Sequence, residues 1–384
     1  MINTNVISLK KTVFMLSLLG ASHSALANTY VYVSNQTDAT ISAYKLDTSA
    51  KARLIPIEQA SAAKLAMPMA ASADGKFLYA AMREKPYALY TYRINPKTGQ
   101  LILADTIAMP DSMVSLGLDR TGKWLLSASY GGFTIGVHRI TDTGLPEKSP
   151  RQFFKSGGKN PHSIRVDYSN STVYVPHLGT DEIRSYAFDA SRDMPMATTA
   201  TSLPTKKGFG PRHSAISPDN KHVYILSELT GYINVYQRED NGELKEVQTI
   251  SSQPADTMLV PGQPRVPVGT PGAVPFDESR AVWSADIQMT PNGKFLYSSE
   301  RTLSTLSQFA VDSAGRLTYL GQIKTEKGPR GFAIDPSGRY VVVSGEKSPT
   351  VSLYSIDQNS GLLKYINKYP VGKGANWVTI VDVN

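Results

Sequence analysis

Arginine, histidine and acidic residues occupy related places in a segment that occurs several times in the chain. Residues 211–224 (PRHSAISPDNKHVY) return in related form as 283–297 and again as 329–343. Arg212 and His213 begin the first copy, Asp286 lies near the start of the second, and Arg330 near the start of the third. Guanidinium groups bind carboxylate or phosphate, and imidazole and carboxylate groups exchange protons. The set indicates a site that combines anion binding with acid–base chemistry.

Each copy of the segment predicts a strand, a tight polar turn and a second strand. The turn pairs are Asp74-Gly75, Thr121-Gly122, Ser169-Asn170, Asp219-Asn220, Asn292-Gly293 and Ser337-Gly338. Asn-Gly and Asp-Gly favour two-residue hairpin turns, in which both central residues have positive φ. β-Branched and aromatic residues follow every turn, as strands require. We therefore expect repeated hairpins, spaced 45 to 50 residues apart except for one gap of 73.

A third and a fourth strand complete each unit, as in 89–94 followed by 101–104. Four strands in about 45 residues form one blade of a β-propeller. Six units are complete, and 30–34 with 40–44 resemble the second and third strands of a seventh. The C-terminal segment 375–382 supplies the missing first strand. We predict an all-β fold, a seven-bladed β-propeller whose ring is closed by the C-terminal strand joining the N-terminal blade, so that no sheet edge is open at the seam.

The N-terminus has the pattern of a secretory signal peptide. Lys10 and Lys11 precede an apolar run from Val13 to Leu19, and Ala25-Leu26-Ala27 is a small-x-small cleavage site. We expect residues 1–27 to be removed near Ala27, residues 28–384 to form one propeller domain, and the protein to be periplasmic or secreted. An ordinary disordered N-terminus or a short membrane anchor is the alternative. No stretch is long and apolar enough to predict a membrane span.

The bulk composition narrows the function classes. The chain has no cysteine, which excludes disulfides and thiolate chemistry. Its net charge of +8 falls to +6 without Lys10 and Lys11, and its basic residues form no run. Nucleic-acid binding is therefore not expected, whereas a mild positive field suits an anionic small-molecule substrate. The histidine spacing matches no metal motif, so we expect no metal and no cofactor, and we expect a monomer.

Propeller geometry predicts where the chemical groups meet. The first strand of a blade begins, and the second ends, at one mouth of the central channel. Arg212 then faces Glu228, His162 faces His177, Arg301 lies opposite Trp283, and Arg330 lies opposite 345–347. The mouth set also includes His213, Asp286, Glu346 and Lys347, with Arg83 and Glu84 as further candidates. Several arginines at one concave mouth predict a binding site for an anion.

The segment 254–280, which holds the excess residues of the long gap, is rich in proline and glycine. It joins the last strand of one blade to the first strand of the next, on the side of the mouth. A passive surface loop is our first interpretation, and a lid over the mouth is the alternative.

Three pairs of motifs carry a family resemblance. They are 210–213 (GPRH) with 227–229 (SEL), 283–287 (WSADI) with 297–301 (YSSER), and 328–332 (GPRGF) with 345–348 (GEKS); 160–163 (NPHS) fits the same pattern. In order and spacing they resemble the seven-bladed propeller lactonase family, which includes bacterial 6-phosphogluconolactonases and fungal carboxymuconate cyclases. The likeness extends over about residues 29–384. It implies a catalytic set of His162, Arg212, Glu228 and Arg301. Of the other residues that the geometry places at the mouth, we expect His213, Asp286, Arg330, Lys347 and His177 to bind substrate.

The resemblance implies hydrolysis of a lactone. An export signal favours an unphosphorylated sugar lactone or another lactone acid over a phosphorylated sugar lactone. Glu228 opposite Arg212 is expected to be ionised, which makes His162 the first candidate for proton transfer and Glu228 the second. The alternatives are an exported propeller that binds without catalysis and a muconate-type cyclase.

Overall fold

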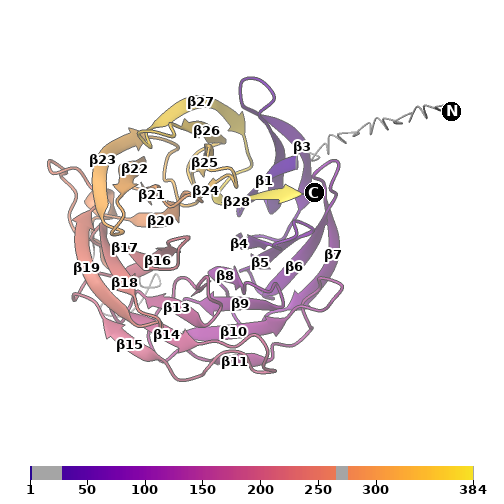
Figure 1. The fold of residues 1–384 in the computed structure, drawn as a ribbon, viewed down its shortest axis with the longest axis horizontal. Helices are drawn as coiled ribbons and strands as arrows, with labels where there is room; N and C mark the ends of the chain where they lie inside the picture. The colour runs from indigo at the N-terminus through magenta and orange to yellow at the C-terminus, as the bar shows by residue number, and fades with distance from the viewer. Residues whose placement is uncertain (2–27, 265–275, 384) are drawn as a thin grey trace.

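A computed structural model of the protein describes residues 1, 28–264 and 276–383. In this part of the chain, seven four-stranded antiparallel sheets stand around a central channel (Figure 1). The innermost strand of each sheet lines the channel, and the outermost lies at the rim. The prediction of a seven-bladed β-propeller is confirmed.

Each sheet contains strands that follow one another in the chain, except for the sheet that closes the ring. Blade 1 consists of β28 (Ala375–Val383), β1 (Asn28–Asn35), β2 (Thr40–Asp47) and β3 (Arg53–Ser61). Blades 2 and 3 consist of β4 (Ala66–Ala71), β5 (Phe77–Met82), β6 (Ala88–Ile94) and β7 (Leu101–Ala108), and of β8 (Ser115–Leu118), β9 (Trp124–Ser129), β10 (Thr134–Arg139) and β11 (Gln152–Lys155). Blades 4 and 5 consist of β12 (Arg165–Val166), β13 (Thr172–His177), β14 (Glu182–Ala187) and β15 (Thr201–Pro204), and of β16 (Pro211–Ile216), β17 (His222–Ser227), β18 (Tyr232–Arg238) and β19 (Leu244–Ser251). Blades 6 and 7 consist of β20 (Ser284–Met289), β21 (Phe295–Glu300), β22 (Thr305–Val311) and β23 (Leu317–Lys324), and of β24 (Phe332–Ile334), β25 (Tyr340–Ser344), β26 (Thr350–Ile356) and β27 (Leu363–Pro370).

The ring closes where the two ends of the chain pair with each other. The antiparallel register of β1 and β28 sets Asn28 opposite Val383 and Ser34 opposite Trp377. Figure 1 shows the C-terminal arrow of β28 beside β1. The predicted closure by the C-terminal strand is confirmed.

The turns between first and second strands differ from the expected two-residue type. In blade 2, Ser72 and Phe77 close the hairpin, with Ser72 N–H donating to Phe77 C=O at 2.9 Å and Gly75 N–H donating to Ser72 C=O at 3.0 Å. At each predicted pair the second residue alone has positive φ, between 59° and 72°. The connection therefore has four residues, so Asp, Asn, Ser or Thr is tolerated at the preceding position, where φ is negative.

A repeated tyrosine joins neighbouring blades. The hydroxyl on the second strand of one blade donates to a glycine carbonyl in the next blade, as for Tyr224 and Gly315 at 2.9 Å. Four further bonds of this kind join Tyr32 to Gly99, Tyr79 to Gly144, Tyr174 to Gly242 and Tyr297 to Gly361. Apolar side chains fill the spaces between blades around these bonds. The rigid ring that results positions the residues at the channel mouth.

Two predictions concern parts of the chain near or beyond the described range. The predicted signal peptide, apart from residue 1, lies outside the described residues. Of the segment 254–280, residues 254–264 and 276–280 are described and include the short 3-10 helix η1 (Glu278–Arg280). No helix in the described residues is long and apolar enough to cross a membrane.

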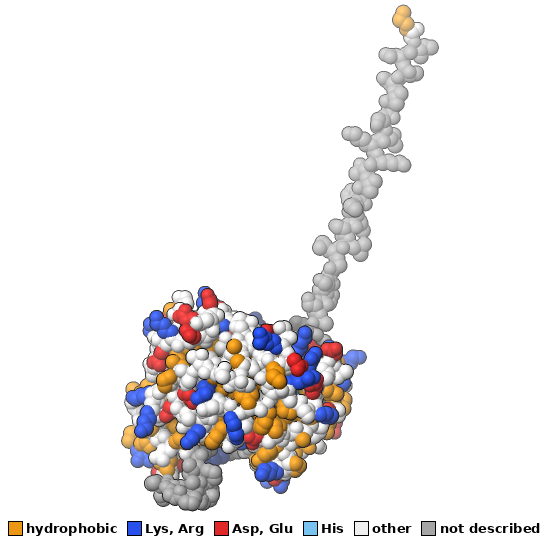
Figure 2. All heavy atoms as spheres, turned by 90° about the horizontal axis from the view of Figure 1, so that it is seen from below, with side chains coloured by type: hydrophobic (Ala, Val, Ile, Leu, Met, Phe, Trp, Pro, Cys, Tyr) orange, Lys and Arg blue, Asp and Glu red, His pale blue; other side chains and the backbone are white. Residues whose placement is uncertain are grey.

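Positive and negative side chains are scattered over the face that Figure 2 shows, and apolar side chains lie among them. This view is consistent with the scattered charge of the sequence. The expected lack of nucleic-acid binding and the expected monomer stay predictions.

Candidate active site

One position in each of blades 2 to 6 delivers a side chain to the channel mouth. It comes eight residues after the positive-φ residue of the turn and immediately follows the second strand. In blades 2 to 6 this position holds Arg83, Tyr130, Leu178, Glu228 and Arg301, which all line one pocket. The same count in blade 7 gives Glu346, which forms an ion pair with the pocket residue Arg330. The repeat thus supplies the site from several blades at equal height.

The pocket at the mouth has a volume of about 170 Å³. It is lined by Arg83, Val114, Tyr130, His162, Leu178, Glu228, Leu229, Pro264, Trp283, Arg301 and Arg330. Pockets that take drug-sized ligands measure roughly 300–1,000 Å³. The smaller volume suits a ligand of about the size of one sugar ring.

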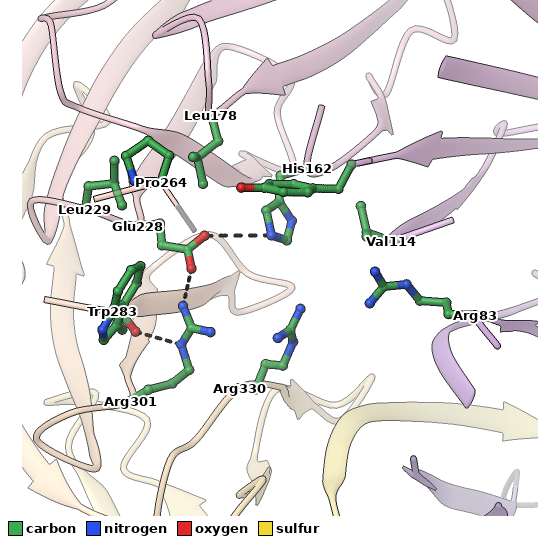
Figure 3. A pocket seen from close by; sticks show the side chains of 11 residues that line it. Arg83, Val114, His162, Leu178, Glu228, Leu229, Pro264, Trp283, Arg301 and Arg330 are labelled. Atoms are coloured by element: carbon green, nitrogen blue, oxygen red, sulfur yellow. Dashed lines mark hydrogen bonds and ion pairs between the residues drawn. The ribbon is translucent and has the colours of Figure 1, made fainter. Parts of the chain in front are cut away.

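Glu228 is the centre of a buried charge cluster (Figure 3). Its Oε1 accepts a hydrogen bond from Arg301 Nη2, and its Oε2 accepts one from Arg212 Nε at 3.1 Å. His162 Nε2 lies 3.7 Å from the same Oε2. Arg301 Nε also donates to the Trp283 carbonyl at 2.9 Å, which fixes the guanidinium plane. One carboxylate therefore holds two arginines and one histidine from three blades.

Burial and charge set the protonation states in this cluster. Burial by itself would raise the pKa of Glu228, but Arg301 and Arg212 outweigh it and hold that pKa well below its usual range. Burial, followed by the charge of Arg212, lowers the pKa of His162 far below its usual value. At neutral pH the site therefore contains a carboxylate, two guanidinium groups and a neutral imidazole. A neutral imidazole is able to accept a proton.

Arg83 lies across the pocket from this cluster, and Arg330 lies between Arg301 and Arg83 in Figure 3. Figure 3 shows both guanidinium groups directed into the open space of the pocket. Arg83 Nε donates to Ser112 Oγ at 3.1 Å, and Arg330 Nη1 contacts Glu346 Oε1 at 3.2 Å. Burial, together with the positive charge of Arg330, lowers the pKa of Arg83 to about 10. Two arginines that repel each other across a concave site favour an anion between them.

Comparisons with known proteins agree with this geometry. The family described as "Lactonase, 7-bladed beta-propeller" matches residues 27–380. The chain belongs to this lactonase family. The predicted resemblance is confirmed, and with it the prediction of a lactonase-type enzyme that acts by hydrolysis of a lactone.

The relatives of this lactonase-family chain cover nearly its whole length. A 6-phosphogluconolactonase from Photorhabdus laumondii is 34% identical over 352 residues, which is 91% of this chain and 98% of the relative. One from Serratia proteamaculans is 35% identical over 353 residues, again 91% of this chain and 98% of the relative. Among solved structures, a periplasmic gluconolactonase from Pseudomonas aeruginosa matches with a TM-score of 0.77 at 23% identity, over 94% of this chain and all of the other. That structural likeness shows the fold.

The lactonase-family chain brings together most, but not all, of the residues singled out from its sequence. His162, Glu228, Arg301 and Arg330 line the pocket. Arg212 does not, because the shift of register between Pro211 and His213 turns it beneath Glu228, where it also donates to the Ala285 carbonyl. His213 and Asp286 lie below the pocket as a hydrogen-bonded pair.

Three further residues predicted at the mouth lie outside the pocket. His177 is fully buried on β13, where its Nδ1 contacts the Val175 carbonyl at 2.8 Å and its ring packs on Gly158. The next residue, Leu178, takes the mouth position, so the expected place of His177 is wrong by one residue. Lys347 and Glu84 are exposed and lie outside the pocket wall. Counting eight residues forward from each turn identifies Leu178 and Tyr130 as pocket residues. Pairing residues at equal distances before and after the turn did not identify them.

The described part of the 254–280 segment lies against the pocket. Gly262 N–H donates to the Leu229 carbonyl at 2.7 Å, and Val282 N–H donates to the Val260 carbonyl at 2.9 Å. Pro264 then forms part of the pocket wall (Figure 3). Pro264 thus contributes to the site, while the choice between a passive loop and a lid for the whole segment stays a prediction.

Proposed function

We propose that the protein hydrolyses a sugar lactone at the channel mouth. The observation that supports this most strongly is the joint presence, in one small pocket, of a neutral His162 and of two arginines directed into the open space. Lactone hydrolysis requires a base for the attacking water and a cation for the developing oxyanion. The names of the relatives support the same reaction type.

The residues take distinct roles in this proposal. His162 Nε2 accepts a proton from the attacking water as the water oxygen bonds to the lactone carbonyl carbon, and the imidazolium then protonates the departing ring oxygen. Glu228 does not accept the proton, because both of its carboxylate oxygens already accept hydrogen bonds from Arg301 and Arg212. It orients His162 and compensates its positive charge. Arg330 lies close enough to both His162 and Arg83 to influence their pKa values, and we assign it to the carbonyl oxygen.

Arg83 is assigned to an anionic or strongly polar substituent at the far end of the substrate. The pairing of Arg330 with Glu346 leaves Arg83 as the pocket arginine for which no carboxylate contact occurs among the described residues. A sugar lactone that carries a carboxylate or phosphate would use this charge, whereas a neutral sugar lactone would use it as a hydrogen-bond donor. The export signal read from the sequence favours the neutral or carboxylate form.

The experiment is a panel of lactones followed by acid release at constant pH, with the protein lacking residues 1–27. We expect hydrolysis of gluconolactone or its 6-phosphate by the parent, and loss of at least 10²-fold in kcat for His162→Ala, as for removal of a general base. Arg83→Met is expected to raise KM for the phosphorylated lactone more than for the neutral one. Activity of His162→Ala within twofold of the parent, or no hydrolysis of any lactone, would refute the proposal; loss of the ultraviolet absorption of a diene acid would indicate a cyclase instead.

We also propose that the chain is exported and cleaved near Ala27. The support is the basic, apolar and small-residue pattern of residues 10–27. The test is expression of the full chain in a bacterium, followed by fractionation and N-terminal sequencing. A periplasmic protein that starts near Asn28 is expected, and an uncleaved protein in the cytoplasm would contradict the export.

A further inference from the structure

His213 and Asp286 form a buried pair for which the proposed reaction has no use so far. His213 Nδ1 lies 2.8 Å from Asp286 Oδ1, and the two residues are 4% and 5% exposed. Asp286 also accepts hydrogen bonds from the Ile287 N–H at 2.9 Å and from Gln288 Nε2 at 3.2 Å. Burial raises the pKa of Asp286, and Arg165, Arg212 and these hydrogen bonds act against burial. In its ionised form the carboxylate only accepts, so the pair places the imidazole proton on Nδ1 of His213 and leaves Nε2 as an acceptor.

The pair lies directly beside the proposed base. The rings of His213 and His162 are 5.4 Å apart between centroids and meet edge to face at 68°. Nε2 of His213 and Nδ1 of His162 are both buried, and neither has a hydrogen-bond partner in the described residues. A buried polar atom without a partner costs about 1–3 kcal/mol, so two on adjacent rings call for a functional reason.

The charges around His162 supply that reason. Arg212, a protonated His213 and Arg330 oppose a positive charge on this ring, and Glu228 favours one. Glu228 is already shared between two arginines. Around His213, Arg212, Arg165 and Arg330 are positive, and Glu228 and the hydrogen-bonded Asp286 are negative. Asp286 is hydrogen-bonded to His213, whose ring packs against His162, so a second carboxyl group lies one ring away from the proposed base.

We propose that His213 and Asp286 are positioning residues that hold the His162 ring and stabilise the positive charge it gains during lactone hydrolysis. The proton leaves the attacking water for Nε2 of His162 and later passes to the departing ring oxygen, so the pair gains and loses none. Asp286 hydrogen-bonded to Nδ1–H makes the rest of the His213 ring electron-rich, and an electron-rich ring attracts an adjacent cation. This inference rests on the proposed function of the same pocket.

The opposite side of the pair supports a role in the protein rather than in substrate binding. Asp286 and Gln288 line a separate cavity of about 330 Å³ within the channel, together with Arg165 and Trp377. The Trp377 ring packs against His213 at 6.0 Å and 60°. A substrate in the mouth pocket therefore meets His162, and the pair supports His162 from below.

The central experiment is Asp286→Asn, with Asp335→Asn as its matched control. Asp335 is similarly buried, 4% exposed, but lies in the turn at the opposite end of blade 7 and accepts bonds from Arg339 N–H and Tyr340 N–H. We expect kcat of Asp286→Asn to fall about ten- to hundredfold with little change in KM, by analogy with the loss when the hydrogen-bond partner of a metal-ligating histidine is removed. The acid limb of its kcat/KM profile is expected to move to lower pH, because His162 then gains a proton less readily. Asp335→Asn is expected to lose stability but keep the parent profile.

A second measurement separates this inference from the proposed function. Nitrogen-15 spectra of histidine-labelled protein report the tautomer of His213 and the titration of His162 without substrate. We expect the proton of His213 on Nδ1 in the parent, and a lower His162 pKa in Asp286→Asn. If the parent hydrolyses no lactone, the proposed function fails, and the spectra still test the coupling of the two rings.

The inference is wrong if Asp286→Asn keeps kcat within threefold and an unchanged pH profile, or if the titration of His162 does not move. Should Asp286→Asn fail to fold, His213→Gln removes the ring and keeps an amide in its place. The same fall in kcat is then expected, and parent-like kcat would overturn the inference.

Discussion

Replacement of Glu228 by glutamine removes the negative charge that compensates two buried guanidinium groups. Arg212 is 1% exposed and Arg301 is 9% exposed, and both hydrogen-bond to this carboxylate. Breaking a buried ion pair by removing one partner costs about 3–5 kcal/mol, because the other charge stays buried and uncompensated. Unfolding entropy of about 2.1 cal/mol/K per residue gives about 0.7 kcal/mol/K for a domain of this size. The melting temperature of Glu228→Gln is therefore expected to fall by about 4–7 °C.

The pH dependence tests the cause of that loss. The pKa of Glu228 is depressed in the folded protein, so the pair stabilises the fold above the unfolded value of about 4.3 and loses this contribution as the pH falls below it. The difference in unfolding free energy between parent and Glu228→Gln should be constant above about pH 5 and shrink below about pH 4. Urea unfolding at several pH values measures it. Glu243→Gln, on an exposed turn, is the control and should change stability by less than about 0.5 kcal/mol. An equal loss at pH 3 and pH 7, or no loss at pH 7, would refute the charge-compensation argument.

Two further predictions concern the ring and the inserted segment. Tyr224→Phe removes the hydroxyl that donates to the Gly315 carbonyl and leaves that carbonyl unpaired. Urea unfolding should show a loss of about 1–3 kcal/mol in the free energy of unfolding, with kcat/KM unchanged. A loss in activity without a loss in stability would contradict a purely structural role. In Gly262→Ala the new Cβ would lie 2.6 Å from the Val282 carbonyl oxygen, which forces residues 260–264 away from the pocket. KM should rise because Pro264 leaves the wall, whereas Gly131→Ala, whose Cβ meets open space, should keep the parent KM; equal KM values for both variants would show that the segment does not shape the site.

The fold followed from the sequence because its signals are local and repeated. Turn pairs such as Asn292-Gly293 mark each hairpin, and the strand patterns on either side need no knowledge of distant residues. The closure by 375–382 also followed, because an N-terminal blade without a first strand and a C-terminal strand without a partner complete each other. The sequence did not predict the turn type. The same residue pairs fit a two-residue turn with two positive-φ residues and the observed four-residue connection with one.

The sequence predicted contacts in the site only where both residues belong to one hairpin. Arg212 with Glu228 and Arg301 with Trp283 are neighbours across a single pair of strands, and counting from the turn places them. The shift of register at 211–213 is not visible in that count, so Arg212 was expected in the pocket wall and lies beneath it. His213 and Asp286 belong to different blades, and only the ring brings them within 2.8 Å of each other.

The repeat also explains how a symmetric ring forms a site with one-sided chemistry. The position eight residues after the turn lines the pocket in blades 2 to 6, so the fold fixes the height of this position but not which residue occupies it. Arginine at blades 2 and 6, glutamate at blade 5 and apolar or aromatic residues at blades 3 and 4 therefore arrange charge around the channel without any change in backbone. A substitution at one of these positions alters the chemistry of the pocket. It does not remove the hydrogen bonds between blades, such as that from Tyr224 to Gly315, because these are made by other residues of the same strands. Stability and specificity are thus carried by different residues of each repeat, with Glu228 as the exception, because it both compensates the buried arginines and orients His162.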